Sequence, residues 1–171
     1  SGALEVAILA QPEAFSERLH NIPLFREPFV IVVAKDSPLA LQQSIRVRDL
    51  DGMDYLERIN CEFGAAASRI FDQQGVKDRT VYKSDRDDWI LAMAAAGLGY
   101  SFMPARCAVH TGVATLRLIE PEIWREVSLV TVRGRPYSTP LGAFVRETMR
   151  IFRRLQDDRS EVADGNFVID A

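Results

Sequence analysis

The sequence lacks long apolar runs and has few cysteines and histidines. No apolar stretch approaches about 18 residues, the length that a membrane-spanning helix needs. The start, SGALEVAILAQPE, has no basic segment ahead of a long apolar one, so we expect neither a membrane span nor a secretory signal. Two cysteines, Cys61 and Cys107, are too few for a disulfide scaffold and favour a reduced, cytoplasmic setting. The two histidines fit no metal-ligand spacing, so no metal and no cofactor is predicted.

The charges of the chain nearly balance. There are 21 Lys and Arg against 24 Asp and Glu, a net charge of −3. The last fifteen residues, DDRSEVADGNFVIDA, carry five acids and one arginine, so the rest of the chain is close to neutral. A neutral body is a poor candidate for binding nucleic acid by bulk electrostatics. The hydrophobic share of 47% and the charged share of 26% are ordinary for a globular chain and exclude a wholly disordered one.

Short apolar runs alternate along the chain with segments of helical periodicity. Helices are predicted from the cap Asn60 to Gly75, from Ser84 to Gly97 and from Thr139 to about Gln156, with short helical turns at 47–50 and 104–110. Strands are predicted at 4–10, 28–34, 53–59, 80–83, before Pro104, 114–119 and 126–132.

This alternation predicts an α/β fold with a parallel or mixed sheet and helices on both faces. Ligands of such sheets collect at the carboxyl ends of the strands. The loops there, which are our candidates for a binding site, are 11–13, 60–63, 84–88, 103–106 and 133–137.

Four segments together resemble the effector-binding domain of LysR-type transcriptional regulators. They are PLFREPFVIVVAKDSPLA, DLDGMDYLERINCEF, YKSDRDDWILAMAAAGLGYSFMP and REVSLVTVRGRP. The piece most typical of the family is MAAAGLGYSFMP, a small-residue helix followed by Gly-x-Gly and a strand that ends in proline. The resemblance covers nearly all of residues 1–155.

The resemblance implies a fold of two Rossmann-like lobes with mixed sheets, similar to a type II periplasmic binding protein. Lobe I would comprise 1–36 and 119–156, lobe II would comprise 37–118, and 157–171 would be a flexible acidic tail. Nothing before LEVAILA matches the family's winged helix-turn-helix or the first strand–helix–strand unit of its sensor domain, so we expect lobe I to be incomplete.

The function that the resemblance implies is the sensing of a small polar or anionic effector in the cleft between the lobes. The domain would form a homodimer or tetramer and would act on DNA only through the missing N-terminal domain. We expect no enzyme activity. The candidate effector-binding residues are Asn60, Cys61, Glu62, Phe63, Ser84, Met103 and Pro104.

Cys61 carries the alternative hypothesis. With Asn60 as the helix cap, the helix dipole would stabilise the Cys61 thiolate, with help from Arg58 and against Glu62. A cysteine in the corresponding loop is the oxidant-reactive residue of the family's peroxide-sensing members. The helix that follows holds no second cysteine, and Cys107 lies on a different element. Three roles therefore stay open for Cys61. It is the reactive residue of a thiol-based oxidant sensor, the thiol used by a thiol-dependent enzyme, or a residue that only lines the cleft.

Several neighbours of these loops have two interpretations. The acidic residues at 85, 87 and 88 are expected to cap a helix rather than to do acid–base work, whereas Ser84 can cap or bind a ligand carboxylate. Trp89 is expected in the core, and Phe63 in the core or in a pocket wall. Arg133 and Arg135 are expected to be solvated. A plain solute-binding protein remains a third class of function.

Overall fold

The protein is described by a computed structural model that covers residues 4–77 and 79–164, with side chains described to residue 154. The chain divides into two compact units. The first unit comprises Ser1–Leu9, Phe15–Phe25 and Val127–Ala171, and the second comprises Ala10–Ala14 and Arg26–Glu126. The lobe limits expected from the sequence stay a prediction.

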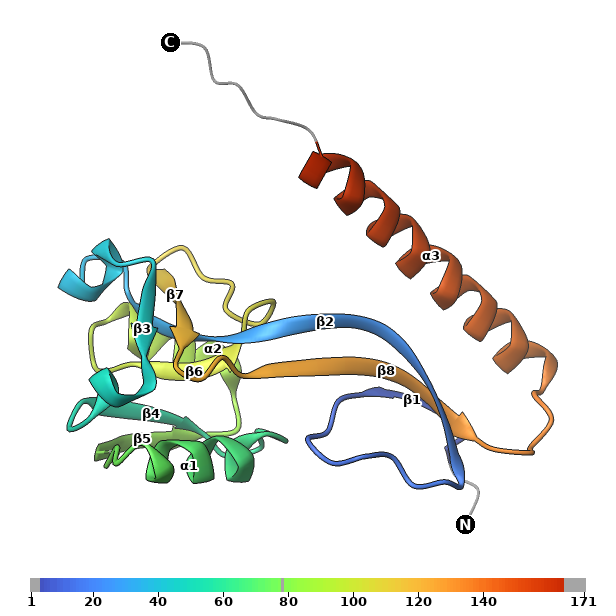
Figure 1. Cartoon of the computed structure of the whole chain (residues 1–171), viewed down its shortest axis with the longest axis horizontal. Coiled ribbons are helices and arrows are strands. Elements are labelled where there is room, and N and C mark those ends of the chain that lie inside the picture. The colour runs from blue at the N-terminus through green and yellow to red at the C-terminus, as the bar shows by residue number, and fades with distance from the viewer. Residues whose placement is uncertain (1–3, 78, 165–171) are drawn as a thin grey trace, which may run out of the picture. The chain divides into compact units, whose positions relative to one another are not determined.

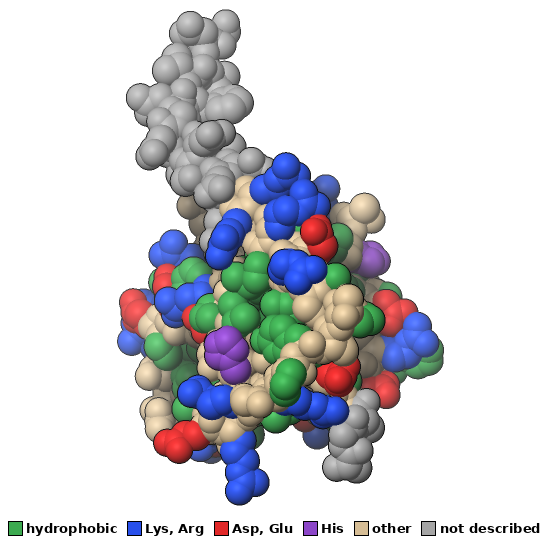
Figure 2. Space-filling view, turned by 90° about the vertical axis from the view of Figure 1, so that its right-hand side faces the viewer, with side chains coloured by type: hydrophobic (Ala, Val, Ile, Leu, Met, Phe, Trp, Pro, Cys, Tyr) green, Lys and Arg blue, Asp and Glu red, His purple; other side chains and the backbone are tan. Residues whose placement is uncertain are grey.

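The first unit is built from three strands and one long helix (Figure 1). Strand β1 (Val6–Leu9) pairs antiparallel with β8 (Trp124–Val132), and β8 lies beside β2 (Leu19–Ala34). Helix α3 (Thr139–Asp164) supplies two residues of the core, whose members are Leu24, Leu129, Leu141 and Val145. Figure 2 shows apolar side chains gathered on the face that is turned to the viewer, with basic side chains around them.

The apolar side chains of helix α3 are only partly buried. Leu141 and Val145 are buried, whereas Phe144 and Ile151 are about half exposed. The cap is Ser138 rather than Thr139, because the Ser138 hydroxyl accepts the Leu141 N–H at 3.4 Å and the Ser138 carbonyl accepts the Gly142 N–H at 2.8 Å. The helix extends to Asp164, past the expected end near Gln156, and residues 165–171 of the expected tail lie outside the described residues.

The second unit holds most of the remaining elements, in a sheet of mixed strand directions. Strand β2 pairs antiparallel with both β6 and β7, β3 pairs parallel with β7, and β4 pairs parallel with β5 in a separate two-stranded sheet. The bounds are η1 (Pro38–Leu41), β3 (Ser44–Arg46), η2 (Val47–Leu50), β4 (Asp54–Arg58), α1 (Gly64–Gln73), β5 (Arg79–Ser84), α2 (Asp87–Ala95), β6 (Ser101–Pro104) and β7 (Val113–Ile119). The predicted α/β fold class is confirmed.

Strand β2 separates two apolar clusters of the second unit because successive side chains point to opposite faces. Phe29, Ile31 and Val33 pack in the cluster that α1 covers, and Val30 and Val32 pack in the cluster that α2 covers. The nearly all-apolar run 28–34 is therefore a strand buried on both faces, as predicted.

Two sequence-based expectations about the second unit are wrong. Pro104 ends β6 and residues 105–107 form a turn, so the short helix expected at 104–110 is absent there. Trp89, expected in the core, is 51% exposed, because it lies in the first turn of α2 on the side away from the buried Ile90 and Leu91. No helix among the described residues is long and apolar enough to cross a membrane.

The Gly-x-Gly turn between α2 and β6 brings two backbones into close contact. A Cβ on Gly99 would lie 2.5 Å from the Asp54 carbonyl oxygen, so only glycine fits there without a shift of the backbone. The next residue, Tyr100, donates its N–H to the same oxygen at 2.9 Å. The turn thus fixes β6 against the start of β4, whose other end leads into the site.

Candidate functional site

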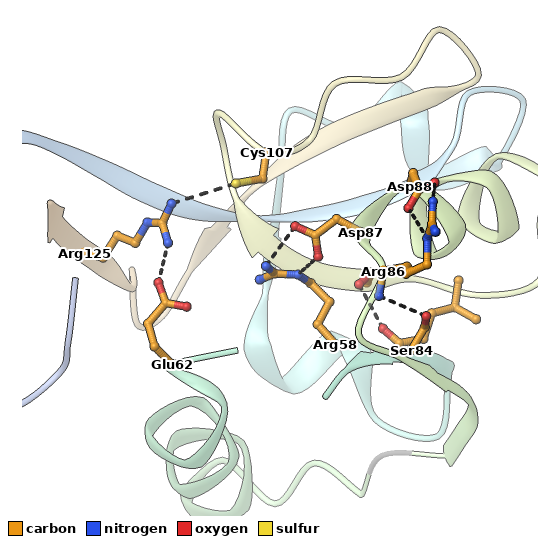
Figure 3. A network of polar contacts seen from close by, with 10 residues as sticks. Arg58, Glu62, Ser84, Arg86, Asp87, Asp88, Cys107 and Arg125 are labelled. Carbon is orange, nitrogen blue, oxygen red and sulfur yellow. Dashed lines mark hydrogen bonds and ion pairs between the residues drawn. The ribbon is translucent and has the colours of Figure 1, made fainter. Parts of the chain in front are cut away.

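Charged side chains from four elements of the second unit meet near the end of β4 (Figure 3). They come from β2, from β4 and the loop 59–63, from the first turn of α2, and from the start of β8, and a thiol from the turn after β6 joins them. The members are Glu27, Arg58, Glu62, Asp87, Cys107 and Arg125, which we call the charged cluster.

Arg58 is held by a two-pronged ion pair. Its Nε donates to Asp87 Oδ1 at 2.6 Å and its Nη2 donates to Asp87 Oδ2 at 3.0 Å. Burial favours a lower pKa for Arg58, but the hydrogen bonds and charge of Asp87 outweigh it and the pKa is raised. The side chain is 11% exposed, and its Nη1 is buried with no hydrogen-bond partner among the described residues. A buried donor without an acceptor is costly, which makes Nη1 a position where a ligand oxygen would be stabilised.

A cavity of about 550 Å³ opens beside Arg58. This volume lies within the range of small-molecule sites, about 300–1,000 Å³. Its walls come from β4, from the loop 59–61, from α1 and from the start of β5, and they include Arg58, Cys61, Ser68 and Lys77. Of the residues predicted from the sequence to bind an effector, Cys61 lines this cavity.

Arg125 joins two carboxylates and a thiol. Its Nε donates to Glu27 Oε1 at 2.9 Å, its Nη1 donates to Glu62 Oε1, and its Nη2 lies 3.8 Å from Cys107 Sγ. Glu27 also accepts the backbone N–H of Arg106 at 2.9 Å. The Glu27 side chain is only 3% exposed, and these two partners satisfy both of its oxygens, as a buried carboxylate requires.

The environment of the two thiols differs from the expectation. Burial is the largest influence on both and raises the pKa of Cys61 and of Cys107, although the positive charges of Arg58 and Arg125 act to lower them. We expected Cys61 at the start of a helix, where the helix dipole would stabilise its thiolate. This prediction is wrong because α1 begins at Gly64 and has Phe63 at its cap position. Cys61 lies three residues before the helix, and its carbonyl accepts the Gly64 N–H at 2.9 Å.

The remaining predicted site residues lie in different surroundings. Asn60 is exposed in a turn and does not cap α1. Phe63 packs in the core at 5.2 Å from the Phe29 ring, while Met103 and Pro104 are buried in β6 beside β2. Their role with an effector stays a prediction.

Ser84 ends β5 and does not cap α2. Its hydroxyl accepts the Arg86 N–H at 3.0 Å, and Arg86 is the cap residue. Asp87 and Asp88 lie in the first turn of α2 as expected, and Asp88 pairs with Arg86 at 2.7 Å. The Arg86 guanidinium also lies 5.5 Å from the exposed Trp89 ring.

Sequence reasoning missed Glu27, Arg125 and the partner role of Asp87. Glu27 directly precedes the apolar run 28–34, and Arg125 directly precedes the run 126–132. A charged residue that borders a buried strand is the one available signal, and it does not tell a buried ion pair from a solvated strand end. Among the described residues, no group of three or more His, Cys, Asp or Glu could hold a metal ion.

Comparison with known proteins gives the family. Residues 1–152 match the LysR substrate binding domain family. The chain is 31% identical over 160 residues to the hydrogen peroxide-inducible genes activator of Dickeya chrysanthemi, covering 88% of this chain and 52% of the relative. It is 32% identical over 145 residues to the DNA-binding transcriptional dual regulator OxyR of Escherichia coli K12, covering 80% of this chain and 46% of the relative. The chain thus spans about half the length of these relatives.

A solved structure shows the same fold. The effector-binding domain of QuiR in complex with shikimate aligns with a TM-score of 0.73 and 21% identity, covering 88% of this chain and 72% of that domain. The fold is therefore that of the type II periplasmic binding proteins, as the sequence predicted. This chain belongs to the LysR substrate-binding domain family and is a LysR-type effector-binding domain.

Proposed function

We propose that this chain is the ligand-sensing part of a transcriptional regulator and that it binds a small anionic or polar ligand at the Arg58 Nη1. The observation that carries the proposal is the buried, unpartnered Nη1 of Arg58, a residue that lines a cavity of about 550 Å³. Hydrogen bonds between a guanidinium and a carboxylate are about twice as strong as neutral ones, so a carboxylate is the ligand group that this donor favours.

Small carboxylates can test this proposal in matched pairs. QuiR is a structural neighbour in complex with shikimate, so we choose shikimate and its neutral methyl ester as probes, measured by ligand-observed NMR and calorimetry. The acid should bind at least about ten-fold more tightly than the ester, since a charged hydrogen bond contributes about 1.5–3 kcal/mol.

The matched variants concern Arg58 and its partner. Arg58→Gln together with Asp87→Asn replaces the ion pair by neutral amides and should abolish the preference for the acid. Asp87→Asn alone keeps the guanidinium and should retain it. Equal binding of acid and ester by the unmodified chain, or an unchanged preference without Arg58, would contradict the proposal.

The other parts of the proposed function follow from the family. LysR-type regulators respond to small-molecule effectors, work as oligomers and contact DNA through an N-terminal domain. We propose that this chain likewise forms a homodimer or tetramer. Ligand binding to it would reposition the DNA-binding domains of a longer cytoplasmic protein. The relatives are transcriptional regulators, and we propose no catalytic role for this chain.

Oxidant sensing by Cys61 is the second candidate. It is supported by the relatives named hydrogen peroxide-inducible genes activators and by the charges of Arg58 and Arg125, which act to lower the Cys61 pKa against the larger effect of burial. A hydroperoxide would oxidise the Cys61 thiolate to a sulfenic acid and leave as water or alcohol. Mass spectrometry of peroxide-treated protein should then show added oxygen that is lost in Cys61→Ser and kept in Cys107→Ser. An unmodified mass after treatment would remove this candidate.

A further inference from the structure

Two carboxylates share the guanidinium of Arg125, and they differ in burial. Glu27 accepts from Nε at 2.9 Å and lies 2.8 Å from Nη2, and its side chain is 3% exposed. Glu62 accepts from Nη1, and its side chain is 32% exposed. Glu27 is therefore the fixed partner of Arg125, whereas solvent and a dissolved ligand can reach Glu62. Figure 3 shows the Glu62 carboxylate directed toward the Arg125 guanidinium.

The charge of this group makes Glu62 exchangeable. Glu27, Glu62 and Arg125 together carry two negative charges and one positive charge, which leaves one carboxylate in excess. A ligand with one carboxylate that replaced Glu62 on Nη1 would leave the buried charge unchanged. Such an exchange avoids the cost of burying an additional charge.

Glu62 is a sequence neighbour of residues that line the cavity beside Arg58. Glu62 follows Cys61, which lines that cavity, and both lie on the loop 59–63 that begins where β4 ends with Arg58. Arg125 Nη2 lies 3.8 Å from Cys107 Sγ, and the charges of Arg58 and Arg125 act on both thiols.

We infer that Glu62 is an internal competitor that occupies Arg125 in the ligand-free chain and that a carboxylate group of a ligand displaces it from Nη1. The inference rests on the proposed function, because it concerns the same charged cluster, in which Arg58 lines the cavity and Glu62 and Arg125 lie outside its wall. Displacement frees the loop 59–63 from β8 while Glu27 keeps Arg125 attached to β2. Strand β2 carries Glu27 and strand β8 carries Arg125, so these two strands stay joined through the Glu27–Arg125 pair after the exchange.

The test is a titration with acetate as the probe, against sodium chloride at equal ionic strength. Glu62→Gln removes the competing charge and keeps the size of the side chain. We expect this variant to be stabilised by acetate, seen as a rise in Tm, at a concentration at least about ten-fold lower than the unmodified chain requires. An unchanged acetate response in Glu62→Gln would overturn the inference.

Glu122→Gln is the matched control. Glu122 is 41% exposed and pairs with Arg117 at 3.2 Å, so its loss changes the net charge equally but frees no bond to Arg125. This control should respond to acetate like the unmodified chain. An equal gain in Glu122→Gln would reduce the effect to a change in net charge and would overturn the inference.

Dependence on Arg125 completes the test. In a chain with Arg125→Gln and Glu27→Gln, which replaces the buried ion pair by amides, Glu62→Gln should add no acetate response. If that chain does not fold, nitrogen-15 NMR of the arginine Nε–H groups in Glu62→Gln supplies the answer, since acetate should shift the Arg125 resonance. An unmoved Arg125 resonance would overturn the inference. The proposed function fails separately, through binding that does not depend on Arg58.

Discussion

Burial of charge governs the chemistry of the site at the scale of single residues. Asp87 satisfies two of the three nitrogens of Arg58, and Glu27 and Glu62 share Arg125. Arg125 and Glu27 form the buried pair of the cluster, and removing one partner of a buried pair leaves an uncompensated charge, which costs about 3–5 kcal/mol. The charged cluster is therefore stable while each guanidinium keeps a carboxylate partner. An anionic ligand can bind there by accepting a hydrogen bond from an unpartnered nitrogen or by replacing a carboxylate.

The raised pKa values of the two thiols predict how the free energy of unfolding changes with pH. Because burial raises the pKa of Cys61 and Cys107, the folded chain keeps these protons at a pH where the unfolded chain releases them. Their stabilising effect is complete below the thiol pKa of an unfolded chain, about 8.5, and is lost as the pH rises through the raised folded values.

The measurement for this prediction is urea unfolding at pH 8 and pH 10 under reducing conditions, compared with a chain carrying Cys61→Ser and Cys107→Ser. The unmodified chain should lose more of its free energy of unfolding between the two pH values than the double variant does. Equal losses would show that the thiols have ordinary pKa values in the folded chain.

At the scale of elements, local hydrogen bonds decide where helices begin. The helix caps suggested by the sequence are Asn60, Ser84 and Thr139. In the structure, the cap positions of α1, α2 and α3 are taken by Phe63, Arg86 and Ser138. Short polar side chains also stabilise turns, and the Ser84 hydroxyl does so by accepting the Arg86 N–H. The loop 59–63 is therefore longer than expected, which places Glu62 where it can reach Arg125.

The cap of α3 gives a prediction at this scale. Ser138→Ala removes the hydroxyl that accepts the Leu141 N–H and should lower the free energy of unfolding by about 0.5–2 kcal/mol. Thr139→Ala changes an exposed residue inside the first turn and should have an effect within about 0.5 kcal/mol. Chemical denaturation of both variants measures the difference, and a larger loss in Thr139→Ala would reverse the assignment of the cap.

At the scale of the whole molecule, the chain resembles the sensing half of a longer regulator. It spans about half the length of its relatives, and its net charge of −3 supplies no basic surface in excess. Phosphate contacts supply most of the affinity of non-specific DNA binding, and base contacts supply sequence specificity. The charge balance therefore does not favour DNA binding by bulk electrostatics, which agrees with the sensing role proposed for this chain.

The prediction at this scale is that the isolated chain selects no DNA sequence. Selection from a pool of randomised duplexes, followed by gel shift at low salt, should enrich no sequence. The chain fused to a winged helix-turn-helix domain of a LysR relative is the positive control. Enrichment of one sequence by the isolated chain would contradict the proposal that DNA is bound by another domain.

The fold class and most strands could be predicted from the sequence because they depend on local periodicity. The nearly all-apolar run 28–34 predicts a strand buried on both faces, and the structure has one there. The strand predicted at 126–132 also forms, and it is buried on both faces from Val127 to Thr131. The family could also be identified, because the order of segments and the turn around Gly99 survive as linear patterns. These features determine the scaffold and the loop that carries Cys61 and Glu62.

Only the tertiary structure decided which charges meet. Glu27 and Arg125 are 98 residues apart, and Arg58 and Asp87 are 29 apart, so no local pattern pairs them. The same is true of burial, which raises the Cys61 pKa and leaves the Arg58 Nη1 without a partner among the described residues. Charge pairing and desolvation depend on distance in space, and the sequence records only distance along the chain.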